Sequence, residues 1–174
     1  LIGYHGQVIY ERYFGLADKG TGRRLTPDAG VQLASTSKTF TATAIMYLHQ
    51  HKYLNIDHTV QTYLPTFPYS KVTIKMLLNH RSGLPDYLKW FARYNKNTLT
   101  PIYNDELLAL FAKHKPGLEF TPDTRFKYSN SNYAILARLI EEVTEMNYRD
   151  FMQQYFFDPL GMNSTFVYDP AWGL

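Results

Sequence analysis

The apolar pattern of the chain changes once, close to residue 35, and this change limits the folds that the sequence can adopt. Residues 1–14 read as two extended runs around a turn at His5-Gly6, followed by a loop at residues 18–24. From residue 35 onward, apolar residues recur at spacings of three and four, which is typical of helices. The sequence therefore predicts a small antiparallel strand pair followed by a mainly helical region.

Helices are expected over residues 35–50, 74–79, 132–144 and 148–157, with a further helix beginning at Asn104. The stretch 132–144 has the clearest apolar stripe, which comprises Ile135, Leu136, Leu139, Ile140 and Val143. A two-stranded hairpin is only marginally stable alone, so the opening strands are expected to belong to a larger sheet.

The composition excludes several classes of function. The formal charge of +3 is small and the basic residues are scattered, which does not favour nucleic-acid binding. No apolar run is long enough to span a bilayer. Cysteine is absent and the histidines show no metal-ligand spacing, so we expect no disulfide, no metal and no other cofactor. A length of 174 residues suits one domain.

Ser35-Thr36-Ser37-Lys38 is an S-x-x-K tetrapeptide at the expected start of a helix. The spacing of three places Ser35 and Lys38 on one helical face, within reach of each other. A serine at this place lies beside unpaired backbone N–H groups that suit a developing oxyanion, and the lysine can help to remove its hydroxyl proton. About one such tetrapeptide is expected by chance in a chain of this size. The alternative is a structural role, in which Ser35 caps the helix and Lys38 points to solvent.

Tyr128-Ser129-Asn130 follows a segment broken by Pro and Gly and precedes the most amphipathic helix. A tyrosine beside an ammonium group can shuttle a proton, because the positive charge favours the phenolate. The Asn130 amide could donate to a substrate carbonyl and accept from Lys38. On its own, the tripeptide is explained equally well by an Asx-type turn that leads into the helix.

Together with two further segments, these motifs resemble the serine β-lactamases and penicillin-binding proteins, particularly the class C β-lactamase and esterase branch. Residues 33–42 look like the nucleophile helix of that family, and residues 77–87 resemble its L-L-x-H-x-S-G-L segment. Residues 116–130 look like the approach to its Y-x-N motif, and residues 159–165 resemble its P-L-G-M-x-x-T segment. The segments occur in family order and cover most of the chain.

The resemblance implies a role for each matching residue. Ser35 matches the acylated nucleophile, and its backbone N–H would supply one half of the oxyanion hole. Lys38 matches the lysine that assists proton transfer, and Tyr128 matches the tyrosine that passes the proton to the leaving group. Asn130 matches the asparagine that positions substrate and lysine. His80 and Ser82 lie in a segment that is mainly structural in the family.

The sequence departs from the family pattern in three ways. Asp123 and Asn132 stand where the family usually has Gly, and both residue types tolerate left-handed turns. No segment after Asn130 resembles the family's third motif, a Lys- or His-containing triad ending in Gly on a late strand. We therefore expect a truncated α/β (α+β) β-lactamase/transpeptidase-like fold, one incomplete domain over residues 1–174, with strands in 1–34 and helices in 35–174. The unpaired sheet edge could pair with a second copy of the chain.

The resulting expectation is a serine hydrolase that forms an acyl-enzyme on Ser35 and acts on a β-lactam, a D-amino-acid peptide or an ester. Two alternatives are a sensor that binds penicillin or peptide without turnover, and an inactive fragment of such an enzyme. The expected partner is a small-molecule or peptide substrate. The resemblance places the protein in the periplasm or cell envelope, although no signal segment is visible in the sequence.

Overall fold

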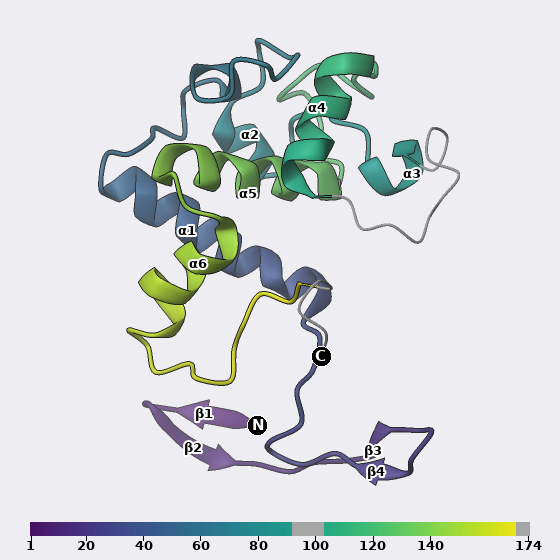
Figure 1. Ribbon diagram of the computed structural model, residues 1–174, viewed down its shortest axis with the longest axis vertical. Helices are drawn as coiled ribbons and strands as arrows, with labels where there is room; N and C mark the ends of the chain where they lie inside the picture. The colour runs from purple at the N-terminus through teal and green to yellow at the C-terminus, as the bar shows by residue number, and fades with distance from the viewer. Residues whose placement is uncertain (92–102, 170–174) are drawn as a thin grey trace. The chain divides into compact units, whose positions relative to one another are not determined.

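The structure is a computed structural model that describes residues 1–91 and 103–169, apart from the side chain of Phe91. The chain divides into two compact units, Leu1–Ala34 and Ser35–Leu174. The division falls where the sequence predicts the change from strands to helices. Figure 1 shows strands in the first unit and helices in the second.

The first unit contains two antiparallel hairpins. Strand β1 (Ile2–Tyr4) pairs with β2 (Gln7–Tyr10) around His5 and Gly6, whose φ angles of 45° and 76° give the left-handed turn that suits a tight hairpin. Strand β3 (Leu16–Asp18) pairs with β4 (Arg23–Arg24). Every residue of β1 and β2 is exposed, and self-association through these strands stays a prediction.

The second hairpin corrects the sequence analysis, which expected one extended run through residue 14 and then a loop. The second run ends at Tyr10 instead of continuing through residue 14, and strands β3 and β4 lie at residues 16–18 and 23–24, on either side of a turn within the predicted loop. The turn between these strands is closed by Asp18, whose Oδ1 accepts hydrogen bonds from the backbone N–H groups of Gly20 and Thr21 at 2.7 and 3.2 Å. This is the local behaviour that makes Asp a turn residue.

The second unit is helical over most of its described length. Its 3₁₀ turn η1 (Ala34–Ser37), which begins one residue before the unit, leads into α1 (Lys38–Gln50), and η2 (Val60–Thr62), α2 (Ile74–Leu78) and α3 (Tyr87–Phe91) follow. After the gap come α4 (Asn104–His114), α5 (Asn130–Thr144), α6 (Tyr148–Met152) and the π-helical turn η3 (Gln153–Phe157). The expected helices are confirmed to within two residues at their ends when η1 is counted with α1 and η3 with α6, whereas α3 was not predicted. None of the helices in residues 1–91 and 103–169 is long and apolar enough to cross a membrane.

Helix α5 is the central element of the second unit. It contacts α1, α2, α3, α4 and α6, and Figure 1 shows it among these helices. Most of its predicted apolar stripe is buried: Ile135, Leu136, Leu139 and Ile140 are fully inaccessible to solvent, and Val143 is half-buried against the core. The aromatic side chains of Phe67, Phe111 and Phe151 fill the same core. Burial of such side chains is the main stabilising contribution to a unit of this kind.

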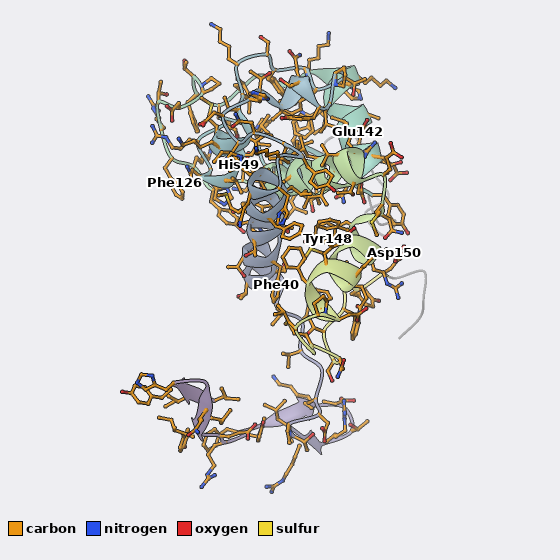
Figure 2. All side chains as sticks on the ribbon, turned by 90° about the vertical axis from the view of Figure 1, so that its left-hand side faces the viewer. Phe40, His49, Phe126, Glu142, Tyr148 and Asp150 are labelled. Atoms are coloured by element: carbon orange, nitrogen blue, oxygen red, sulfur yellow. The ribbon has the colours of Figure 1, made fainter. Side chains whose placement is uncertain are left out.

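The C-terminal helices hold α1 in place from one side. Figure 2 shows Phe40 of α1 and Tyr148 of α6 at the junction of these elements. The Thr41 and Tyr148 hydroxyls are hydrogen-bonded at 2.7 Å, and the rings of Phe40 and Phe157 pack edge to face at 5.8 Å. Because α1 also contacts α5, its N-terminal end is fixed relative to the start of α5. These two helix starts carry the residues that the sequence analysis singled out.

Candidate active site

Ser35 lies in η1, directly before α1, and its side chain is exposed. The residue before it, Ala34, has a φ of 48°, a left-handed conformation that is uncommon for a residue with a Cβ. Backbone strain of this kind is concentrated at functional sites, where the surrounding structure holds it. The turn places the Ser35 N–H at the start of a helix, where backbone donors lack intrahelical partners.

Lys38 is half-buried, and its Nζ atom lies between the two motifs. The Nζ atom donates hydrogen bonds to Ser35 Oγ at 3.3 Å and to Asn130 Oδ1 at 2.9 Å. The helix-cap alternative for this tetrapeptide is wrong, because Lys38 does not point to solvent and the α1 cap residue is Ser37. The contact between Ser35 and Lys38 that their spacing predicted is therefore confirmed.

Tyr128 completes the contacts around the serine. Its phenolic oxygen lies 2.7 Å from Ser35 Oγ and donates to Asn130 Oδ1 at 3.3 Å. Since the protonated phenol donates to Asn130, it accepts a hydrogen bond from the Ser35 hydroxyl. Hydrogen bonding from Lys38, and then from Ser35, lowers the pKa of the Tyr128 phenol below its usual value of 10.0. Once the phenol has ionised, its oxygen can take the proton of the serine hydroxyl.

Asn130 begins α5 and joins the other residues through its side chain. Its Oδ1 accepts from both Lys38 and Tyr128, so the side chain does not form the Asx-type turn that was the alternative for this tripeptide. The structure thus brings all the predicted site residues together: Ser35, Lys38, Tyr128 and Asn130. They lie at or just before the starts of α1 and α5. Lys38 and Asn130, which are hydrogen-bonded, are 92 residues apart in sequence.

His80 packs against the site, although the sequence analysis assigned its segment a structural role. Its ring lies 4.6 Å from the Tyr128 ring and 5.2 Å from the Tyr133 ring, centroid to centroid. Its Nδ1 accepts the Ser129 backbone N–H at 3.3 Å, so this nitrogen carries no proton. Burial, and then the charge of Lys38, lowers the pKa of His80 below its usual 6.5, which keeps the imidazole neutral under the phenol.

Asn132 has a different role from the one expected. It does not adopt a left-handed conformation but lies within α5, fully buried. Its Nδ2 lies 3.0 Å from His80 Nδ1, and its Oδ1 accepts the Ser82 hydroxyl at 2.6 Å. The residue is thus a polar link between α5 and the segment before α3. The expectation for Asp123 is confirmed, since its φ is 67°.

Metal-ligating groups are not clustered in the described residues, where no set of three or more His, Cys, Asp or Glu side chains is placed to hold an ion. The side chains that surround Ser35 are instead an amine, a phenol and an amide. Such groups supply proton donors and acceptors for acyl transfer on a serine.

The beta-lactamase family profile matches residues 1–173 of the sequence. The chain belongs to the beta-lactamase family. The β-lactamase/transpeptidase-like fold expected from the motifs is therefore confirmed. Within residues 1–91 and 103–169 it is mostly helical, and its strands are those of the two short hairpins. Membership also confirms the resemblance on which the residue roles were predicted.

Named relatives agree with this assignment. Penicillin-binding protein 4* of Bacillus subtilis is 38% identical over 165 residues, which are 94% of this chain and 36% of that protein. Protein flp of Staphylococcus aureus strain MW2 is 31% identical over 95% of this chain and 33% of its own length. The chain thus spans about a third of the length of these relatives.

Solved structures show the same relationship. A penicillin-binding protein from Bacillus halodurans superposes with a TM-score of 0.77 at 28% identity, over 88% of this chain and 47% of that one. A D-amino acid amidase from Ochrobactrum anthropi gives a TM-score of 0.70 at 30% identity, over 84% of this chain and 40% of that one. An octameric penicillin-binding protein homologue from Pyrococcus abyssi gives 0.79 at 29% identity, over 91% of this chain and 37% of that one.

Proposed function

We propose that this chain carries the acylating residues of a serine hydrolase, with Ser35 as the nucleophile. The observation that supports this most strongly is that the Ser35 hydroxyl is bonded to both Lys38 and Tyr128, at 3.3 and 2.7 Å. A hydroxyl held between an amine and a phenol can lose its proton as it attacks a carbonyl. Membership of the beta-lactamase family supports the same chemistry.

In the proposed reaction, Tyr128 acts as a phenolate. Ser35 Oγ forms a bond to the substrate carbonyl carbon as its proton passes to the ionised Tyr128 oxygen. The carbonyl oxygen becomes an oxyanion, which the Ser35 backbone N–H stabilises. Tyr128 then gives the proton to the departing nitrogen or oxygen as the scissile bond breaks. The attack thus consumes the Tyr128 phenolate, and protonation of the leaving group restores it. The positive charge of Lys38 beside Tyr128 stabilises this phenolate. Water afterwards hydrolyses the acyl-enzyme and releases Ser35.

The proposed substrates are β-lactams, D-amino-acid peptides or amides, and esters. The names of two relatives, a penicillin-binding protein and a D-amino acid amidase, support the first two classes. We further propose that the protein acts in the periplasm or cell envelope. A sensor that acylates without turnover is the competing function, and the lifetime of the acyl-enzyme separates the two.

The test is hydrolysis of a penicillin, a D-alanyl peptide and a p-nitrophenyl ester by the full-length gene product that carries these residues. We expect turnover of at least one class, and Ser35→Ala should lower it by about 10³-fold or more. Thr36→Ala is the matched control, because it removes an exposed hydroxyl from the same 3₁₀ turn and should leave turnover unchanged. Turnover that survives Ser35→Ala would exclude Ser35 as the nucleophile.

A further inference from the structure

We infer that Asp86 is a positioning residue that fixes the amide of Asn130, and through it Lys38, for the acylation step. The inference rests on the proposed function of the Ser35 site. It concerns a residue to which the sequence motifs assign no role. Asp86 lies just before α3 and is half-buried, 44 residues before Asn130 in the chain.

Each carboxylate oxygen of Asp86 has a separate task. Oδ2 accepts two hydrogen bonds from Asn130, at 3.0 Å from the backbone N–H and at 2.9 Å from the side-chain Nδ2. Oδ1 accepts the backbone N–H of Leu88 at 3.0 Å, at the start of α3. The carboxylate thus binds α3 with one oxygen and the first residue of α5 with the other.

The orientation of the Asn130 amide decides whether its oxygen or its nitrogen faces Lys38. An amide accepts at its oxygen and donates at its nitrogen, whereas an ammonium group only donates. With Nδ2 held by Asp86, Oδ1 faces the Lys38 ammonium at 2.9 Å and the Tyr128 hydroxyl at 3.3 Å. An amide bound at its nitrogen end by a carboxylate is also polarised, which strengthens the bond that its oxygen accepts.

A purely structural role for Asp86 predicts something different. On that account the carboxylate only ties the segment before α3 to α5. Ser131 performs the same tie independently, because its Oγ donates to the Pro85 carbonyl at 2.6 Å and accepts the Tyr87 N–H at 2.8 Å. Among the described residues, Ser131 Oγ bonds to Pro85 and Tyr87 but not to Asp86 or the Asn130 amide, so Ser131→Ala loosens the segment without removing a bond of the carboxylate. The Ser131→Ala variant is therefore the matched control for Asp86→Asn.

The primary test is the rate of acylation of the full-length protein carrying Asp86→Asn. This substitution keeps the size of the side chain but replaces one accepting oxygen by a donor. The new amide therefore cannot accept from both Leu88 and Asn130. We expect acylation to slow by about 10- to 100-fold, as for other displacements of a catalytic group. Ser131→Ala should lower the free energy of unfolding but keep the wild-type acylation rate.

A double-mutant comparison shows whether Asp86 acts through Asn130. In an Asn130→Ala background, Asp86→Asn should have almost no further effect on the acylation rate, because its target is already gone. An equal effect of Asp86→Asn in both backgrounds would overturn the inference. Wild-type acylation by Asp86→Asn, or an equal loss in Ser131→Ala, would overturn it as well.

A second readout does not depend on activity. In protein labelled with ¹⁵N-asparagine, the side-chain amide signal of Asn130 is assigned by its loss in Asn130→Ala. Its protons should exchange more slowly with solvent in wild type and in Ser131→Ala than in Asp86→Asn. Equal exchange in all three proteins would overturn the inference. Slow exchange in a wild-type protein that no substrate acylates would instead refute the proposed function alone.

Discussion

Replacing Lys38 with methionine is expected to slow acylation of Ser35 by about 10²- to 10⁴-fold, the range for loss of a group that assists proton transfer. Methionine keeps the length and apolar stem of lysine but removes the Nζ atom. That atom holds Ser35 Oγ at 3.3 Å and Asn130 Oδ1 at 2.9 Å, and it stabilises the phenolate of Tyr128. The rate of acyl-enzyme formation, followed by mass after rapid quenching, measures the effect.

Lys75→Met is the control for a general effect of lysine removal. Lys75 is exposed on α2, where its Nζ pairs with Asp57 at 3.4 Å. An exposed pair of this kind contributes little to stability. We therefore expect Lys75→Met to be acylated at the wild-type rate. If Lys38→Met were acylated as fast as Lys75→Met, the proposed role of the amine in proton transfer would be wrong.

Replacing Gly83 with alanine is expected to lower the free energy of unfolding by about 2–5 kcal/mol, the sum of two effects. The φ of Gly83 is 79°, a conformation that costs an L-residue energy, and an added Cβ would lie 2.3 Å from the carbonyl oxygen of Phe120. That carbonyl cannot withdraw freely, because the adjoining Glu119 N–H donates to the Gly83 carbonyl at 2.8 Å. Urea unfolding of the purified protein measures the loss.

Gly161→Ala separates the two causes. Gly161 also has a positive φ, 65°, but an added Cβ would have no atom within 4 Å. It should therefore show only the conformational cost, about 1–2 kcal/mol. The difference between the two variants reports the clash with Phe120. Equal losses would mean that the backbone around residues 83 and 120 relaxes, and that the segment before α3 is less rigid than the structure indicates.

Much of the helical unit could be predicted from sequence, because local pattern and tertiary burial agree there. The stripe of α5 predicted both the helix and its buried face, since each member lies against a neighbouring helix. Helix α5 begins at Asn130, two residues earlier than the predicted start at Asn132. The hairpin of β3 and β4 has no such pattern. Its turn depends on the bonds that Asp18 makes to two backbone N–H groups.

The candidate site was predictable only where the chemistry is local or a family motif marks it. The Ser35–Lys38 contact follows from helical spacing, whereas the approach of Tyr128 and Asn130 rested on the family resemblance. The resemblance marks His80 only as part of a structural segment, and Asp86 carries no local signal. The positions of both depend on how the segment before α3 packs on α5. Asn132 was misjudged for the same reason. Its buried partners are 50 and 52 residues away in sequence, so a turn was the simpler interpretation.

The most direct test of the central proposal is the intact mass of the full-length protein after incubation with a penicillin, with Ser35→Ala treated in parallel. The account predicts a mass gain equal to that of the drug in wild type, located on the peptide that contains Ser35, and none in the variant. The decay of the adduct then distinguishes a hydrolase from a sensor. An equal adduct on both proteins would contradict the account, because the nucleophile would then be another residue.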